Sequence, residues 1–89
     1  MIRSEIRDNS VNDLQRYGYV VMGFNLHENC WVGYDLEGNK WSVKSKLFDE
    51  GLTYKDAECD KRWYRVCRPD ELVKHGAGKI PRVGVNTRG

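Results

Sequence analysis

The sequence predicts a small α+β domain, formed by an antiparallel sheet or an SH3-like half-barrel of about four strands with short flanking helices. In residues 19–26, Val20, Met22, Phe24 and Leu26 alternate with other residues at period two, and in residues 40–47 apolar side chains alternate with polar ones, as half-buried strands do. Capping and stop residues mark one helix near each end of the chain. With 89 residues, the chain forms a single domain with a small core. The predicted order is α-β-β-β-(short α)-β-α, followed by an extended arm.

The first predicted elements are a helix and a strand. Ser10 can cap the helix, and Gly18 suits the left-handed backbone that ends it. The strand covers residues 19–26, where Val20 and Met22 begin the apolar alternation. We expect its apolar face to pack against the domain core.

A hairpin follows, with arms at residues 30–34 and 40–46. Asp35 favours the first position of a turn, and Gly38 tolerates the left-handed conformation that closes a short loop. The second arm has an apolar face and a basic face, formed in alternation by Trp41, Ser42, Val43, Lys44, Lys46 and Leu47. On the first arm, the residues that face the core are either Trp31 and Gly33 or Val32 and Tyr34, and both alternatives stay open.

The second half of the chain predicts two short helices, a strand and a capped helix. Residues 47–51 suit a helical turn, and residues 53–59 suit another short helix. Residues 61–68 are rich in aromatic and branched side chains and predict a strand. Residues 69–76 predict a helix, because proline comes first, acids occupy the first turn, bases the last, and glycine follows.

We expect one globular domain over residues 1–76 and a glycine-rich basic arm over residues 77–89. No apolar run reaches the roughly 18 residues of a membrane helix, so no membrane contact is expected. The charged start of the chain does not resemble a secretion signal, and an odd number of cysteines fits reduced thiols. These features predict a cytoplasmic protein.

Charge is distributed unevenly along the chain. Residues 61–89 hold eight lysines and arginines but two acids, whereas residues 21–60 hold eight acids and four lysines. Such a bipolar chain favours a protein partner, with nucleic acid as the alternative and self-association also open. The expected partner-binding residues combine aromatic anchors with bases from the second half: Trp31, Trp41, Arg62, Trp63, Tyr64, Arg65, Arg68, Lys79 and Arg82.

The strand at residues 61–68 interleaves bases with aromatic rings, which is typical of a surface that neutralises phosphates and stacks bases. In the competing interpretation Trp63 and Cys67 face the core, and Tyr64 and Val66 make a second apolar contact. Neither face of the strand is cleanly apolar. Mixed faces predict an edge strand or a face that meets a partner.

Catalytic and metal sites are not expected. His27 and Cys30 are three residues apart, and Cys59 and Cys67 could complete a tetrahedral zinc set, but zinc sites usually come as two close ligand pairs. The adjacent carboxylates in the chain point apart and cannot converge on one bond. We therefore expect a small non-enzymatic binding protein without metal or cofactor, such as an adaptor or an inhibitor that occludes a larger target.

Overall fold

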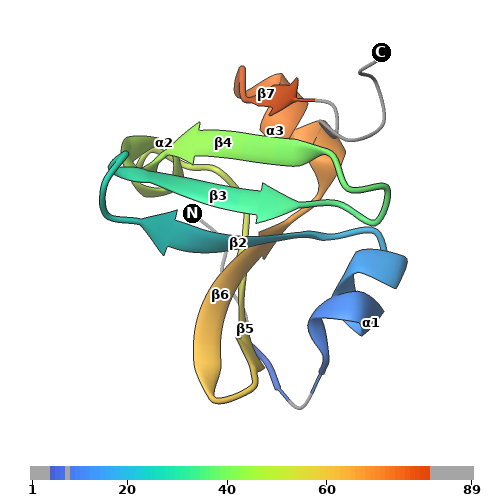
Figure 1. Ribbon diagram of the computed structural model, residues 1–89. Helices are drawn as coiled ribbons and strands as arrows, with labels where there is room; N and C mark the ends of the chain where they lie inside the picture. The colour runs from blue at the N-terminus through green and yellow to red at the C-terminus, as the bar shows by residue number, and fades with distance from the viewer. Residues whose placement is uncertain (1–4, 8, 81–89) are drawn as a thin grey trace.

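The computed structural model describes residues 5–7 and 9–80 of the chain. It has an α+β fold with an open antiparallel sheet and short helices, which confirms the predicted fold class (Figure 1). The elements in chain order are β1 (Glu5–Ile6), α1 (Val11–Arg16), β2 (Val20–Asn25), β3 (Cys30–Tyr34), β4 (Lys40–Lys44), α2 (Ser45–Asp49), β5 (Lys55–Cys59), β6 (Arg62–Cys67), α3 (Pro69–Lys74) and β7 (Gly78–Ile80).

Within the described residues, the sheet has seven strands in the order β1-β5-β6-β2-β3-β4-β7. All neighbours are antiparallel except β1 and β5, which run parallel. Strand β6 lies between β5 and β2, so the prediction of an edge strand at residues 61–68 is wrong. Its mixed faces have another cause, because side chains pack on both faces of its second half, residues 64–67, while Arg62 and Trp63 are exposed.

Local signals in the sequence set several boundaries as expected. The Ser10 hydroxyl caps α1 by accepting a hydrogen bond from the backbone nitrogen of Asp13 at 3.1 Å. Gly18 and Gly38 have φ angles of 93° and 88°, so both use the left-handed conformation that the turns require. The backbone nitrogen of Asp35 donates to the carbonyl of Asn39 at 3.1 Å, which closes the β3–β4 loop.

The predicted short helix at residues 53–59 is wrong, because this segment forms β5. Ala57 and Cys59 are buried at alternate positions, and β5 pairs with β6 along its whole length. The two strands are joined by a tight turn in which Asp60 and Lys61 have φ angles of 52° and 64°. Pairing with β6 and burial of alternate side chains override the weak local signal for a helix.

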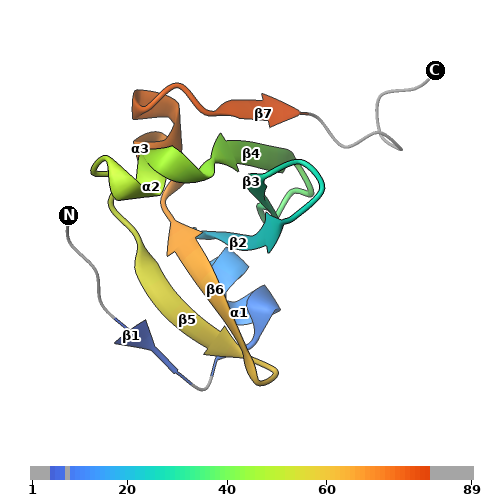
Figure 2. The same ribbon diagram turned by 90° about the vertical axis from the view of Figure 1, so that its left-hand side faces the viewer.

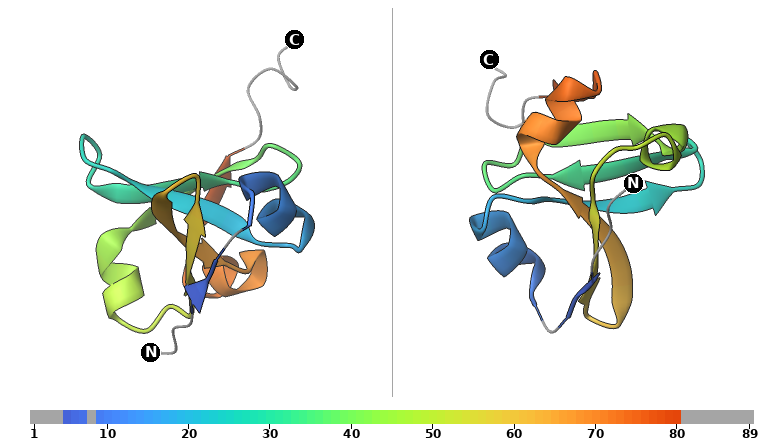
Figure 3. Two further views of the ribbon diagram at one scale, coloured as in Figure 1. Left: turned by 90° about the horizontal axis from the view of Figure 1, so that it is seen from below. Right: turned by 180° about the vertical axis from the view of Figure 1, so that it is seen from behind.

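Two apolar clusters cover opposite faces of the sheet. Helices α2 and α3 pack on one face, as the view from behind shows (Figure 3), and α1 packs on the other (Figure 2). The first cluster contains Val20, Met22, Trp41, Val43, Phe48, Leu52, Tyr54, Cys67 and Leu72. The second contains Leu14, Tyr19, Val21, Ala57, Cys59 and Val66. Trp31 packs against the first cluster, which resolves the inward set of β3.

Short strands lie at both edges of the sheet. Strand β1 pairs with residues 56–57 of β5, and β7 pairs with residues 40–42 of β4. Residues 78–80, which the sequence assigns to the arm, thus join the sheet, while residues 81–89 lie outside the described residues. The division into a domain and an arm stays a prediction. None of the described helices has the length and apolar character needed to span a membrane.

Candidate partner-binding surface

Arg65, a predicted partner-binding residue, is enclosed by aromatic rings of its own domain. Its guanidinium carbon lies 4.6 Å from the centre of the Trp31 ring and 4.4 Å from that of Tyr54. The same carbon lies 4.9 Å from the centre of the Phe48 ring. Among the described residues Arg65 forms no ion pair. The cation is therefore held by ring faces, and Arg65 and Trp31 act together as a structural contact.

Trp41, another predicted anchor, is buried and holds the β3–β4 hairpin. Its Nε1 donates to Oδ2 of Asp35 at 3.1 Å, and Asn39 donates to both oxygens of the same carboxylate. Burial alone would raise the pKa of Asp35, but these hydrogen bonds outweigh it and lower the pKa below its ordinary value. Trp41 is only 2% exposed, so its ring cannot serve as an anchor for a partner.

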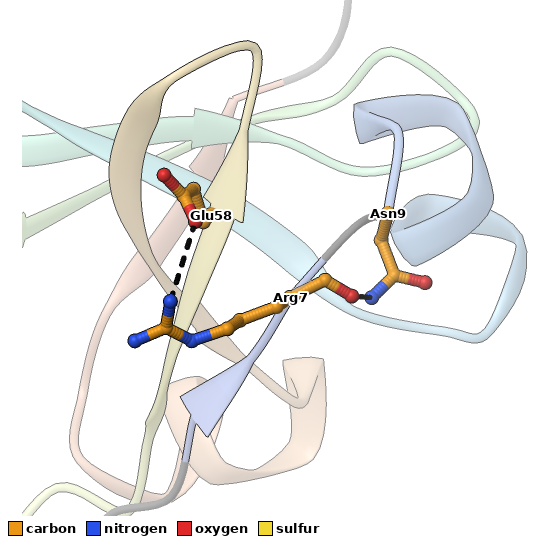
Figure 4. A network of polar contacts seen from close by, with 3 residues as sticks. All are labelled: Arg7, Asn9 and Glu58. Atoms are coloured by element: carbon orange, nitrogen blue, oxygen red, sulfur yellow. Dashed lines mark hydrogen bonds and ion pairs between the residues drawn. The ribbon is translucent and has the colours of Figure 1, made fainter.

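Trp63 and Arg62 lie on the surface near the tip of the β5–β6 hairpin. The Trp63 side chain is 48% exposed, so the expectation that it faces the core is wrong. The Arg7 guanidinium lies 5.3 Å from the Trp63 ring centre and 3.9 Å from Oε1 of Glu58. Figure 4 shows that Arg7 reaches Glu58 while its carbonyl accepts a hydrogen bond from Asn9. These contacts tie the start of the described chain to the hairpin.

Arg68 crosses the start of β2 and covers the ring of Tyr19. Its guanidinium carbon lies 4.1 Å from the ring centre, and its Nη1 donates to the carbonyl of Tyr17. Lys55 approaches the same ring, with Nζ 5.6 Å from the centre. Hydrogen bonding with Lys55 and the charges of both cations lower the pKa of Tyr19, although burial opposes this change.

The four candidate metal ligands do not converge. Cys67 belongs to the first apolar cluster and Cys59 to the second, so they lie on opposite faces of the sheet. Cys30 contacts Ser42 and Glu28, while His27 is exposed in the β2–β3 loop. Burial raises the pKa of the Cys67 thiol to about 12. Among the described residues no group of three or more histidine, cysteine or acidic side chains is placed to hold a metal ion.

The side of β3 and β4 that faces away from α2 and α3 has no described helix in front of it (Figures 1 and 2). We call it the open face, formed by Cys30, Val32, Tyr34, Lys40, Ser42 and Lys44. No described helix lies in front of it in Figure 1, and in Figure 2 it turns to the right, away from α2 and α3. Val32 stands at the centre of β3 and yet belongs to neither apolar cluster. Val32 is partly buried, so it marks an apolar position that the two clusters of the domain do not include.

Aromatic side chains surround Val32 on the open face. Tyr34 is 50% exposed. The ring of Tyr64 lies over Gly23, the residue opposite Val32 on β2, since a Cβ on that glycine would lie 3.7 Å from the Tyr64 ring. Tyr64 is thus the predicted partner-binding residue that borders this face.

Positive charge rims the open face. Lys40 and Lys44 lie on it at either end of β4, and among the described residues neither forms an ion pair. Its strand positions include no carboxylate. Two acids border it: Glu28 of the β2–β3 loop, whose Oε1 accepts from Sγ of Cys30 at 3.7 Å, and Asp35, which follows Tyr34. The arrangement can receive an apolar or aromatic group together with an acidic one.

A hollow continues from the open face towards α1. Its volume is about 410 Å³, and it is lined by Asn12, Gln15, Tyr34, Asp35, Leu36 and Gly38. Leu36 is 50% exposed at its rim. Gln15 donates from Nε2 to the carbonyl of Tyr34 at 3.1 Å, which fixes α1 against the end of β3. The hollow adds polar groups and one apolar side chain to the surface that a partner would meet.

The sequence prediction missed most of this surface. The expected partner-binding residues do not include Val32, Tyr34, Lys40 or Lys44. The sequence does predict a basic face on the second hairpin arm. The signal was present in the alternation of lysine and serine with buried Trp41 and Val43. Of the expected residues further along, Lys79 lies in β7, and Arg82 is outside the described residues.

Comparison of the chain with protein-family models, curated proteins and solved structures finds no match. The functional conclusion therefore depends on the chain's own surface and contacts.

Proposed function

We propose that this chain is a small non-enzymatic binding protein that acts in the cytoplasm through contacts with another protein, as an adaptor or as an inhibitor that occludes a larger target. The observation that supports this most directly is the partly buried Val32, which belongs to neither apolar cluster and is flanked by Tyr34 and by Lys40 and Lys44, two lysines without an ion pair among the described residues. Protein interfaces commonly combine an apolar or aromatic centre with a polar rim.

The charge of the open face selects the kind of protein partner. Lys40 and Lys44 complement a surface that carries aspartate or glutamate around an apolar side chain. A second copy of this chain, docked through the same face, would bring lysines against lysines. The face therefore favours a different, acidic protein over a symmetric dimer.

Charge reversal provides the test. The immobilised protein is compared with the variant Lys40→Glu/Lys44→Glu and with the control Lys61→Glu/Arg62→Glu, which makes the same change in charge on the distant β5–β6 hairpin. A native-host extract is applied after nuclease treatment, and each variant is checked for its fold by circular dichroism. We expect a defined acidic protein to bind to the wild type and the control but not to the open-face variant. Equal binding by both variants, or no bound protein, would refute the proposal.

Nucleic-acid binding is the second candidate, and the tip of the β5–β6 hairpin favours it. Lys61 and Arg62 are exposed there beside the half-exposed Trp63 ring, which Arg7 approaches. A base could stack on that ring while the cations contact phosphates. The exposed surface that could contact nucleic acid here is smaller than the whole strand at residues 61–68 that the sequence predicted, because Arg65 is enclosed by aromatic rings.

The same two variants separate the candidates. Binding of a labelled single-stranded oligonucleotide is measured over a range of salt concentrations. If the second candidate is correct, affinity falls steeply with salt and is lost in Lys61→Glu/Arg62→Glu but kept in Lys40→Glu/Lys44→Glu. Binding that does not depend on salt, or an equal loss in both variants, contradicts it.

A further inference from the structure

A second cluster of cations lies outside the open face, around the buried Tyr19. The Tyr19 side chain is 9% exposed and belongs to the apolar cluster under α1. The guanidinium of Arg68 and the ammonium of Lys55 both contact its ring, at 4.1 and 5.6 Å from the centre. A cavity of about 170 Å³ opens beside them, lined by Tyr19, Thr53, Tyr54, Lys55, Val66, Cys67 and Arg68.

Neither cation is neutralised by the described residues. Lys55 and Arg68 form no ion pair with any described carboxylate. Two positive charges beside one ring repel each other, and partial burial weakens the screening of that repulsion by water. An anion bound between them would remove this cost.

Arg68 is held in place before any ligand arrives. Its Nη1 donates to the carbonyl of Tyr17, and the side chain passes so close to Gly18 that a Cβ there would lie 2.7 Å from Nη1. A guanidinium has five N–H donors, and the carbonyl uses one. The Tyr19 hydroxyl accepts a hydrogen bond from another of these donors. Those that remain are available for an acceptor with several oxygens, at a small entropic cost because the side chain is already ordered.

We propose that Lys55, Arg68 and the hydroxyl of Tyr19 form a binding site for a phosphoryl group, supplied either by free phosphate or by the phosphate of a small ester such as a nucleoside monophosphate. Phosphate carries nearly two negative charges at neutral pH and three acceptor oxygens, which matches two cations and one hydroxyl donor. The exposed Thr53 hydroxyl at the rim supplies a further donor. The cavity has the liquid volume of roughly five water molecules, enough for a phosphoryl group with some of its hydration.

The experiment titrates the full chain with inorganic phosphate and, separately, with adenosine monophosphate, at an ionic strength kept constant with chloride. Backbone resonances of residues 17–19, 55 and 68 report binding. Because the chain has five tyrosines, the pKa of Tyr19 is taken from the difference in phenolate absorbance between the wild type and Tyr19→Phe. Lys55→Met and Arg68→Met remove one cation each, and Lys74→Met, which changes an exposed lysine at the far end of α3, is the control.

We expect phosphate to shift these resonances in the wild type and in Lys74→Met, and each cation variant to weaken binding by about tenfold. Binding should also raise the pKa of Tyr19, because the anion offsets the cations that lower it. Equal affinity for the two ligands identifies a site for the phosphoryl group alone, and tighter binding of the monophosphate extends it to the ester. No response to either ligand beyond that to chloride, in the folded wild type, would overturn the proposal. The open-face residues are unchanged throughout, so this outcome is independent of the proposed protein partner.

Discussion

Replacing Arg65 tests whether its charge stabilises the domain or serves a partner. The cation has three aromatic rings within 4.9 Å and no ion pair among the described residues. A cation–π contact is worth about 0.5–1 kcal/mol at an exposed site and about 2 kcal/mol when desolvated. Arg65 is half-buried, so Arg65→Met, which keeps much of the apolar stem, should lower the free energy of unfolding by about 1–2 kcal/mol. A domain of this size would then melt roughly 5–15 °C lower.

The matched control is Arg62→Met, three residues earlier on the same strand. Arg62 is exposed, and its side chain forms no hydrogen bond, ion pair or ring contact with the other described residues. Its loss should therefore change the free energy of unfolding by less than about 0.5 kcal/mol. Urea denaturation followed by tryptophan fluorescence measures both variants, and Trp31 reports directly on the aromatic enclosure. Equal stabilities for the two variants would refute the idea that the rings hold the Arg65 cation.

Three further predictions concern the hairpins and the buried thiol. Asp35→Ala should destabilise the protein by about 2–3 kcal/mol in urea, because it removes the acceptor of Trp41, whereas Glu37→Ala in the same loop should have little effect; similar losses would contradict this. Lys61→Gly should raise the free energy of unfolding by about 0.5–1 kcal/mol and with it the urea midpoint, since glycine adopts a φ of 64° without strain, and a lower midpoint would count against it. The thiol of Cys67 keeps its proton in the folded state up to a pKa of about 12 but ionises near 9.0 when unfolded, so stability should fall as pH rises between these values, by up to about 1.4 kcal/mol per pH unit. Cys67→Ala should flatten that slope, and an unchanged slope would exclude the thiol as its source.

Much of the fold could be predicted because its signals are local. The Ser10 cap, the glycines at positions 18 and 38, and the proline that starts α3 each act within a few residues. Period-two alternation in β4 likewise depends on one strand. These features needed no knowledge of which strands become neighbours. In β2 the expected alternation does not match the burial, because the start of the strand lies between the two apolar clusters: Val20, Val21 and Met22 are all buried, whereas Phe24 is 40% exposed.

The errors come from contacts between distant segments. Strand β5 carries weak helix signals, and its pairing with β6 decides its conformation. The strand at residues 61–68 has mixed faces because one side packs under α1 while the other meets Trp31, Phe48 and Tyr54. A sequence pattern shows that a strand has two kinds of face, but it does not show which distant side chains cover them.

The role of each base in this chain follows from its place on the sheet and not from the local charge of the sequence. Arg65 belongs to the basic second half and yet is enclosed by aromatic rings, so it contributes little to the charge that a partner meets. Lys40 and Lys44 belong to the acidic middle and yet lie on the open face without an ion pair among the described residues. Lys55 belongs to the acidic middle and Arg68 to the basic second half, and both lie against the ring of Tyr19. The fold therefore places bases from both parts of the sequence in two separate cationic sites. The proposed protein partner and the proposed phosphoryl ligand can be tested separately, because the two sites share none of these four cations.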